Sequence, residues 1–238
     1  MSINAKDPSK KIKTIAIEGS DGAGKETQTL MLADFFRRAG IRVGNVSFPR
    51  YKDTLAGKML FEFMKSPRAA EYDWAHANPK LASRVYAQDR FESKYYLESL
   101  IANHDIVIFD RYVESNLLHQ GGKMKTEEEI INFANWLYDL EYNHLGLPKP
   151  DVTIYLDLDP EVSRERALRR ARGSGIGLDA VESDMEYVRN GAKTGRLYAD
   201  FFGWAVIKCV VPNQDLALPP HELTPEEVHM KIREIVLK

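Results

Sequence analysis

The feature that most constrains this chain is a glycine-rich loop that directly follows its first apolar segment. Residues 12–18 are largely apolar and end in Glu18, and Gly19-Ser-Asp-Gly-Ala-Gly-Lys25 supplies seven positions of the eight-residue phosphate-loop pattern. Glycines let successive backbone N–H groups turn toward phosphate oxygens, and the helix expected over 24–39 points its positive end at the same anion. The pattern therefore predicts a nucleoside triphosphate site rather than an incidental glycine turn.

The eighth position of this pattern holds Glu26, where Ser or Thr usually offers a hydroxyl to Mg²⁺. We expect Glu26 either to point to solvent or to bind a water of the metal. Lys25 is expected to place its charge near the β and γ phosphates. The predicted ATP-binding residues are Gly19, Ser20, Asp21, Gly22, Ala23, Gly24, Lys25, Glu26 and Thr27.

Composition and charge exclude several classes of protein. The formal net charge of -2 over 238 residues argues against a nucleic-acid-coating surface, which needs a basic excess. No apolar run approaches the ~20 residues of a membrane span, and residues 1–13 lack the apolar core of a secretory signal. The single cysteine, Cys209, rules out a disulfide framework within the chain and favours the cytoplasm. We expect a short tail over 1–11 and a single domain over 12–238.

Apolar segments and helical segments alternate along the chain. This alternation, with strands that are mostly apolar throughout, is typical of an α/β fold whose parallel sheet is covered by helices on both faces. Functional residues are then expected beyond the carboxyl ends of the strands. The predicted strands are 12–18, 41–48, 106–110, 151–158 and 205–211, and the predicted helices are 24–39, 55–64, 79–103, 126–145, 160–172, 178–202 and one from Thr224.

Two predicted strands end in residues suited to phosphate or metal. Asp110 closes the strand 106–110, where phosphate-loop proteins place a carboxylate near Mg²⁺, although an Asp there can also cap the next helix. Arg111 follows it and is suited to a bidentate phosphate contact. Phe48-Pro49-Arg50-Tyr51 ends the second strand, where Arg50 is either a second phosphate ligand or an ordinary solvated arginine.

Two predicted helical segments carry arginines at positions suited to binding a base or a phosphate. Tyr86 and Arg90 are four residues apart on one helix face, so they can stack on a base and bond its edge, although surface helices often show this spacing. Five arginines lie within 164–172, directly before Gly173. This pattern favours a mobile lid over about 164–178, and the alternative interpretation is an ordinary solvated helix face.

Taken together, these motifs resemble the thymidylate kinase family over nearly the whole chain. The likeness rests on the order of Glu-Gly-x-Asp-Gly-Ala-Gly-Lys (18–25), Phe-Pro-Arg (48–50), Tyr-x-x-x-Arg (86–90), Asp-Arg-Tyr-x-x-Ser-Asn (110–116), Leu-Gly-Leu-Pro-Lys-Pro-Asp (145–151) and the arginine-rich lid. It implies a phosphate-loop NTPase fold with a five-stranded parallel sheet. It also implies ATP-dependent phosphorylation of dTMP to dTDP with Mg²⁺, in a homodimer.

The resemblance also implies roles for individual residues. Tyr86 would stack on thymine, Arg90 and Asn116 would read the base edge, and Arg50 and Arg111 would hold the dTMP phosphate. Asp21, Asp110 and Glu182 would serve the metal, and Glu182 could instead hold the sugar hydroxyl. The remaining implied site residues are Phe48, Pro49, Tyr51, Ser115 and His119 for the substrate, and Lys25, Arg166, Arg170 and Arg172 for the transferred phosphoryl group.

Three residues depart from the family pattern: Tyr86 adds a hydroxyl that needs a partner, His119 stands in place of a Tyr, and Glu26 replaces the hydroxyl ligand. The family also implies a cis Phe48–Pro49 bond. Two other functions remain open from the residues alone: a deoxynucleoside or other nucleotide kinase, and a nucleotide-binding protein without catalysis.

Overall fold

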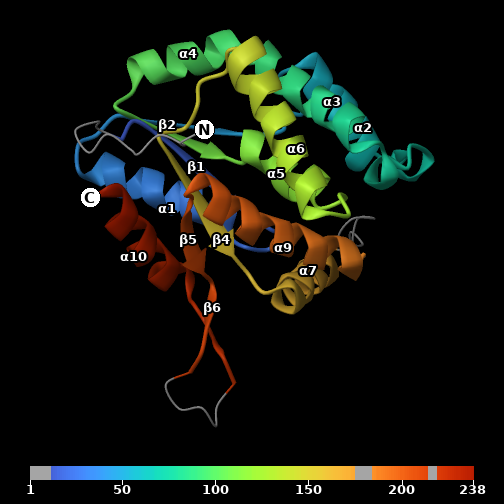
Figure 1. Cartoon of the computed structure of the whole chain (residues 1–238). Helices are drawn as coiled ribbons and strands as arrows, with labels where there is room; N and C mark the ends of the chain where they lie inside the picture. The colour runs from blue at the N-terminus through green and yellow to red at the C-terminus, as the bar shows by residue number, and fades with distance from the viewer. Residues whose placement is uncertain (1–11, 175–183, 214–218) are drawn as a thin grey trace.

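A five-stranded parallel sheet runs through the centre of the molecule (Figure 1). The computed structural model describes residues 12–174, 184–213 and 219–238. The strand order β2-β3-β1-β4-β5 places β1 in the middle, and the pairing of Ile17 with Asp110 brings the carboxyl ends of β1 and β3 to the same edge. The strands are β1 (Thr14–Gly19), β2 (Val43–Ser47), β3 (Ile106–Asp110), β4 (Val152–Asp157) and β5 (Ala205–Lys208).

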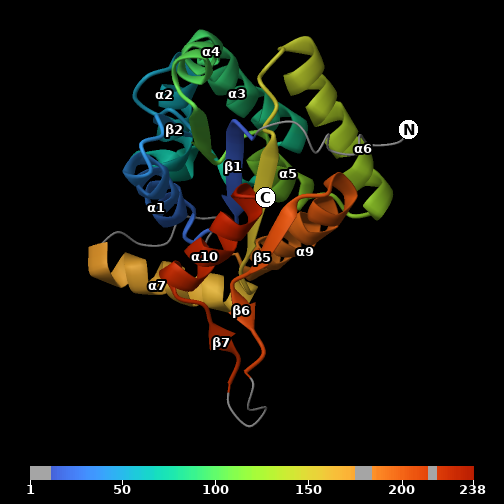
Figure 2. The same cartoon turned by 90° about the vertical axis from the view of Figure 1, so that its left-hand side faces the viewer.

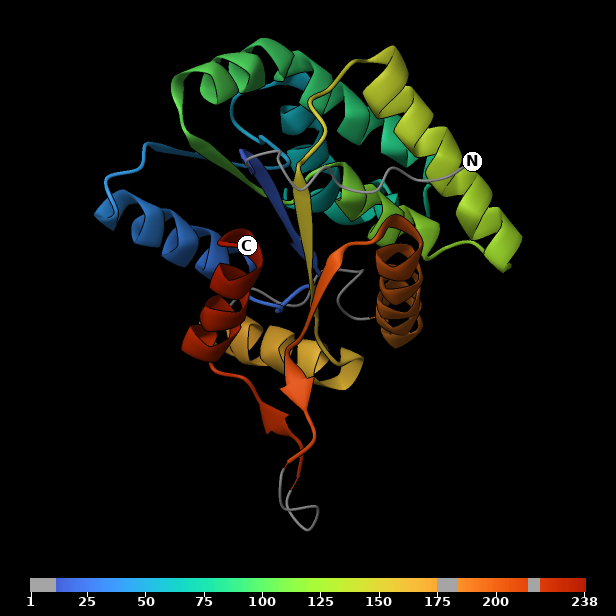
Figure 3. The ribbon, with the colours of Figure 1, turned by 60° about the vertical axis from the view of Figure 1, so that its left-hand side comes forward.

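Helices cover both faces of this sheet (Figure 3). Successive residues of β1 point to opposite sides, so Ile15 and Ile17 join one apolar core while Ala16 joins the other. The first core lies under α1 (Lys25–Arg38) and α10 (Pro225–Val236), and the second under α4 (Lys94–Asn103), α5 (Val113–Gly121) and α9 (Met185–Phe202). The three-layer α/β/α architecture predicted from the sequence is therefore confirmed.

The remaining helices lie farther from the sheet or across its carboxyl edge, except that α6 (Glu127–Tyr138) also contributes buried residues to the second core. Local sequence explains several of their starts: the Asn78 side chain accepts from Lys80 N, and Thr126 forms a capping box with Glu129. They are α2 (Leu55–Met64), α3 (Pro79–Glu92), α6 (Glu127–Tyr138), α7 (Pro160–Ser174), two 3₁₀ turns (Ala69–Glu71 and Trp74–His76) and a π-helical segment (Asp139–His144).

Several predicted boundaries are wrong. The helix expected over 79–103 is two helices, because the chain turns at Ser93, whose Oγ donates to Asp89 O while accepting from Arg50. The helix expected to reach about 145 is helical to His144, but at Asp139 its hydrogen bonding changes from α-helical to π-helical. Helix α7 passes Gly173 and ends at Ser174, whereas α9 begins at Met185 with Asp184 as its cap. Helix α5 was not predicted from the sequence.

The last predicted strand, 205–211, is also wrong in its extent. Only β5 joins the main sheet; β6 (Val210–Val211) pairs with β7 (His221–Glu222) in an antiparallel hairpin that projects from the carboxyl edge (Figure 2). The two pairings meet at Cys209, whose N–H donates to Asp157 O and whose carbonyl accepts from Leu223 N.

The Phe48–Pro49 bond is cis, as predicted. Across 12–174, 184–213 and 219–238, no helix has the length and apolar composition needed to cross a bilayer.

Candidate active site

A cavity of about 160 Å³ opens beside the phosphate loop at the carboxyl edge of the sheet. It receives side chains from the loops after β1, β2 and β3 and from α2, α3, α5 and α9, so the fold assembles it from segments that are distant in sequence. The described residues that line it are Asp21, Phe48, Pro49, Tyr51, Met64, Lys65, Trp74, Tyr86, Arg90, Arg111, Tyr112, Ser115, Asn116, His119, Gln120, Lys123 and Tyr187.

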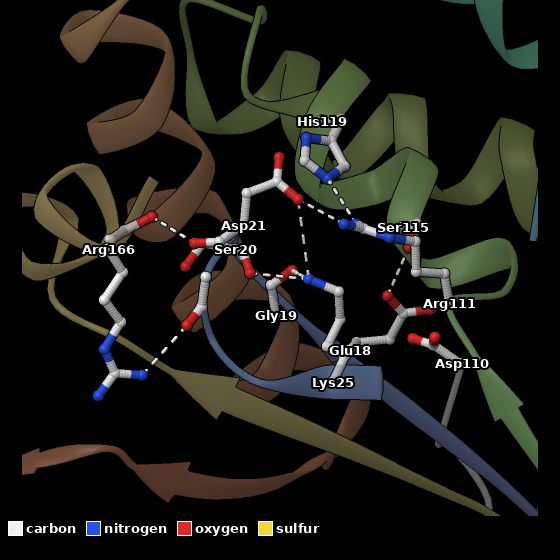
Figure 4. A network of polar contacts seen from close by, with 12 residues as sticks. Glu18, Gly19, Ser20, Asp21, Lys25, Asp110, Arg111, Ser115, His119 and Arg166 are labelled. Atoms are coloured by element: carbon white, nitrogen blue, oxygen red, sulfur yellow. Dashed lines mark hydrogen bonds and ion pairs between the residues drawn. The ribbon is translucent and has the colours of Figure 1, made fainter. Parts of the chain in front are cut away.

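The phosphate loop has the backbone shape that its glycines allow. Gly22 and Gly24 have φ angles of 78° and 89°, which side chains disfavour. The Lys25 ammonium lies inside the loop and donates to Gly19 O at 3.0 Å and Ser20 O at 2.7 Å (Figure 4). Burial and the nearby Arg111 charge lower the pKa of Lys25 to about 8. Glu26 is exposed at the start of α1.

Asp21 and Arg111 form an ion pair where the phosphate loop meets the cavity (Figure 4). Arg111 has a left-handed φ of 64°, which turns its side chain from the end of β3 toward the loop. Burial acts to raise the pKa of Asp21, but the Arg111 and Lys25 charges outweigh it and hold that pKa well below its usual range. His119 Nε2 lies 3.4 Å from Arg111 Nη1, so the histidine adjoins the same ion pair.

Glu18, near the end of β1, holds the residues that follow Arg111 in place. Its fully buried carboxyl group accepts from Tyr112 N and from Ser115 Oγ, each at 2.6 Å, and so ties the start of α5 to the end of β1. Burial, followed by the charge of Glu114, raises the pKa of Glu18 to about 7. Since Arg111 directly precedes Tyr112, Glu18 helps to set the direction of the arginine. It was not predicted as a site residue, although an acid that closes an apolar strand was a usable signal.

A buried ion pair stands at the other end of the cavity. Arg90 Nε lies 2.5 Å from Glu141 Oε2 and Arg90 Nη2 lies 2.6 Å from Glu141 Oε1. Burial acts to lower the pKa of Arg90, but Glu141 offsets this and the pKa lies above its ordinary value. Asn116 Nδ2 lies 3.4 Å from the same Glu141 oxygen, Oε1. Glu141 therefore orients the two side chains that were predicted to read a base.

The Tyr86 hydroxyl has the partners that its burial requires. It accepts from Trp74 Nε1 at 3.2 Å and donates to Met64 Sδ at 3.0 Å. One face of the cavity is thus an aromatic ring held at its tip by two neighbours.

Comparison with known proteins agrees with this geometry. The model of the thymidylate kinase family matches residues 17–193, more than half of the chain. The chain belongs to the thymidylate kinase family. The thymidylate kinase of Mycobacterium tuberculosis is 35% identical over 193 residues, covering 80% of this chain and 86% of that protein. A probable thymidylate kinase of Thermococcus onnurineus is 33% identical over 214 residues, covering 88% and 98%.

A solved structure has the same fold as this chain. The thymidylate kinase of Candida albicans superposes with a TM-score of 0.68 at 20% identity, covering 95% of this chain and 92% of that one. At this identity the likeness speaks for the fold alone.

Not every residue expected from the thymidylate kinase pattern reaches the cavity. Arg50 is absent from the described lining: its guanidinium lies 4.2 Å from the centre of the Tyr96 ring, with Ser93 and Asp53 as polar partners. The adjacent Tyr51 lines the cavity instead. In this structure the Arg50 side chain therefore lies against Ser93, Tyr96 and Asp53. The prediction that Arg50 binds the acceptor phosphate stays a prediction.

The lid arginines of this family member divide into three cases. Arg166 Nη1 donates to Gly22 O at 3.1 Å and Nη2 to Glu222 Oε2 at 3.0 Å, so Arg166 lies against the phosphate loop (Figure 4). Arg172 is exposed on α7. Arg170 belongs to α7, but its side chain lies outside the described part of the structure. The predicted Glu182 also falls outside the described residues.

Sequence reasoning missed Gln120 altogether. This side chain is 4% exposed, lines the cavity one helical turn after Asn116, and its Oε1 has no hydrogen-bond partner among the described residues. The spacing Asn116–Gln120 on one helix face was the available signal, but α5 itself had not been predicted.

Proposed function

We propose that this protein transfers the γ-phosphoryl group of ATP to dTMP, giving dTDP and ADP. The observation that carries the proposal is the meeting of two anion sites at Asp21: the phosphate loop on one side and the Arg111 end of the cavity on the other. An acceptor phosphate oxygen bonds to the γ phosphorus as the bond from that phosphorus to the β–γ bridging oxygen breaks. A phosphate acceptor is largely ionised near neutral pH, so positioning and charge neutralisation do most of the catalysis.

In this proposal the donor phosphates lie in the loop formed by residues 19–25. The Lys25 ammonium leaves the carbonyls of Gly19 and Ser20 and follows the charge on the β and γ phosphates. Arg166 is the lid arginine best supported as a partner of the transferred group, because it already contacts Gly22 O. Arg170 and Arg172 keep the same proposed role, without geometric support.

The acceptor phosphate in this proposal replaces Asp21 as a partner of Arg111. Tyr51 and Ser115 line the cavity, and we propose that their hydroxyls bind the phosphate or the sugar, with His119 beside the deoxyribose. The base stacks on Tyr86, with Arg90, Asn116 and Gln120 facing its edge. Gln120 Oε1 has no hydrogen-bond partner among the described residues, and it gains a donor if the side chain turns toward the base edge.

Magnesium fits the donor chemistry at this edge. Asp21 and Asp110 present carboxylate oxygens near the phosphate loop, and Mg²⁺ commonly binds one or two carboxylates together with nucleotide phosphates. Asp110 is already held by Ser47, whose Oγ donates to Asp110 Oδ2 at 3.2 Å. The described residues contain no group of three His, Cys, Asp or Glu side chains able to hold a metal, which agrees with a site completed by the nucleotide. The ion would supply further charge neutralisation when bound.

A substrate panel tests the proposed reaction. With ATP and Mg²⁺, we expect an ADP-release assay to show highest kcat/KM for dTMP among dTMP, dUMP, dCMP, dGMP and AMP. Thymidine serves as the control, because it lacks the phosphate that Arg111 is proposed to bind. Equal rates across the panel would contradict the assignment, and turnover of thymidine without dTMP would favour a deoxynucleoside kinase. ATP binding without turnover at any Mg²⁺ concentration would identify a non-catalytic nucleotide-binding protein.

We further propose that the protein is a cytoplasmic homodimer. Exposed apolar side chains on α2, α3 and α4, including Leu55, Leu81 and Tyr95 at 68%, 60% and 85% exposure, support an interface there. Light scattering should give twice the 27.2 kDa mass of one chain. Leu81→Glu should lower the measured mass toward that of the monomer, whereas Leu30→Glu on α1 should not. A monomeric parent protein would refute the proposed dimer.

The buried thiol of Cys209 agrees with the proposed cytoplasmic location. Cell fractionation can test this location.

A further inference from the structure

The chain between α2 and α3 brings a tryptophan to the acceptor cavity. Trp74 begins the second 3₁₀ turn and lines the cavity with Met64 and Lys65 from the end of α2. In Figure 1 this segment lies at the outer ends of α2 and α3. Of the three tryptophans in the chain, Trp74 alone is among the described lining residues. It belongs to none of the motifs recognised in the sequence.

Trp74 is held in place by several neighbours. Its Nε1 donates to the Tyr86 hydroxyl at 3.2 Å, and its ring lies 4.7 Å from the Phe63 ring, centre to centre, at 30°. Lys123 Nζ donates to Ala77 O at 3.3 Å and so fastens the same segment to the end of α5. The indole cannot leave the cavity wall without breaking these contacts.

The hydrogen bond to Tyr86 fixes where Trp74 stands relative to the Tyr86 ring. The Tyr86 hydroxyl is at the tip of the ring that we propose stacks on the base. A group bonded to that tip lies past the outer edge of the ring, and the two ring centres are 6.2 Å apart. Trp74 therefore stands at the cavity wall beside the outer part of the Tyr86 ring.

We propose that Trp74 is a specificity-determining residue that limits the size of the base, admitting pyrimidine and excluding purine deoxynucleoside monophosphates. The Tyr86 hydroxyl acts as a positioning group that holds the indole across the cavity. This inference rests on the proposed function. It also explains the polar atom on the stacking ring: phenylalanine at position 86 would leave the Trp74 N–H without this acceptor.

Relative turnover of dGMP and dTMP tests the size limit. In Trp74→Ala we expect the ratio of kcat/KM for dGMP to that for dTMP to rise by about ten-fold or more, since pocket size discriminates on this scale. Tyr86→Phe and Trp74→Phe should each shift the ratio in the same direction by a smaller factor, because each removes the hydrogen bond between these residues but leaves a ring at position 74. Trp136→Phe, outside the cavity lining, is the matched control. An unchanged ratio in both Trp74→Ala and Tyr86→Phe overturns the proposal.

Intrinsic fluorescence gives a readout that does not depend on turnover. We expect dTMP to change the tryptophan emission of the parent protein and of Trp136→Phe, and to leave that of Trp74→Phe unchanged although calorimetry still detects binding. An equal response in Trp74→Phe would place the base away from the indole and contradict the proposal.

If Trp74→Ala fails to fold, Tyr86→Phe and the fluorescence titration still test the role of Trp74. If the parent protein phosphorylates dTMP and neither readout responds, only this inference fails; if it does not phosphorylate dTMP, the proposed function fails.

Discussion

Lys25→Ala is expected to lower kcat by about 10²–10³-fold while leaving dTMP affinity largely intact. The ammonium lies within the phosphate loop, 2.7 Å from Ser20 O, so it is positioned for the donor phosphates and is not among the residues that line the acceptor cavity as described. Its removal takes away a charge that acts on the phosphoryl group in transit, and such losses appear in turnover more than in acceptor binding.

Steady-state kinetics with ATP and dTMP, together with calorimetric titration of dTMP alone, measure the two quantities separately. Lys193→Ala is the matched control, because Lys193 is exposed on α9 and should change neither. Comparable losses of dTMP affinity and of kcat in Lys25→Ala would show that this lysine binds the acceptor, against the role proposed here.

Glu141→Gln is expected to destabilise the protein by about 3–5 kcal/mol, the usual cost of leaving a buried charge unpaired. Glu141 is fully buried and Arg90 is 2% exposed, so water cannot replace the lost carboxylate. The substitution preserves the shape of the side chain, hence no cavity confounds the result. An amide N–H would also face the guanidinium where an oxygen now accepts from it.

Urea unfolding of the parent and variant proteins measures this difference. Glu161→Gln is the control, since Glu161 pairs with Arg189 on the surface and both side chains are about 60% exposed; exposed pairs contribute about 0–1 kcal/mol. Similar small shifts in the two variants would mean that the Arg90–Glu141 pair is not a principal support of the fold. The double variant Arg90→Met/Glu141→Leu should recover stability without recovering dTMP binding.

Secondary structure was predictable where local chemistry is sufficient. Apolar runs identified all five strands of the main sheet, and the Thr126 capping box and the Asn78-Pro79 pair marked two helix starts. The errors in predicted boundaries occur where a residue distant in sequence determines where a helix or strand ends. The turn at Ser93 has a contact from Arg50, and the run 205–211 divides between two strand partners, β4 and β7.

The phosphate loop is the part of the site that the sequence by itself determined. Its glycines, its lysine and the following helix are contiguous, so the loop is shaped by backbone conformations that each residue permits locally. Family membership follows from the order of six such motifs, which needs no knowledge of contacts.

Only the tertiary structure decided how the other side chains are used. The left-handed backbone at Arg111 turns that residue toward Asp21, while Arg50 turns away toward Tyr96. Glu18, Glu141 and Trp74 act through partners at least twelve positions away in the chain. Charge and hydrogen-bonding capacity are properties of a residue, but the direction in which its side chain points depends on which neighbours folding brings within about 3 Å. Pairings of this kind carry no local signal, and so they are visible only once the chain has folded.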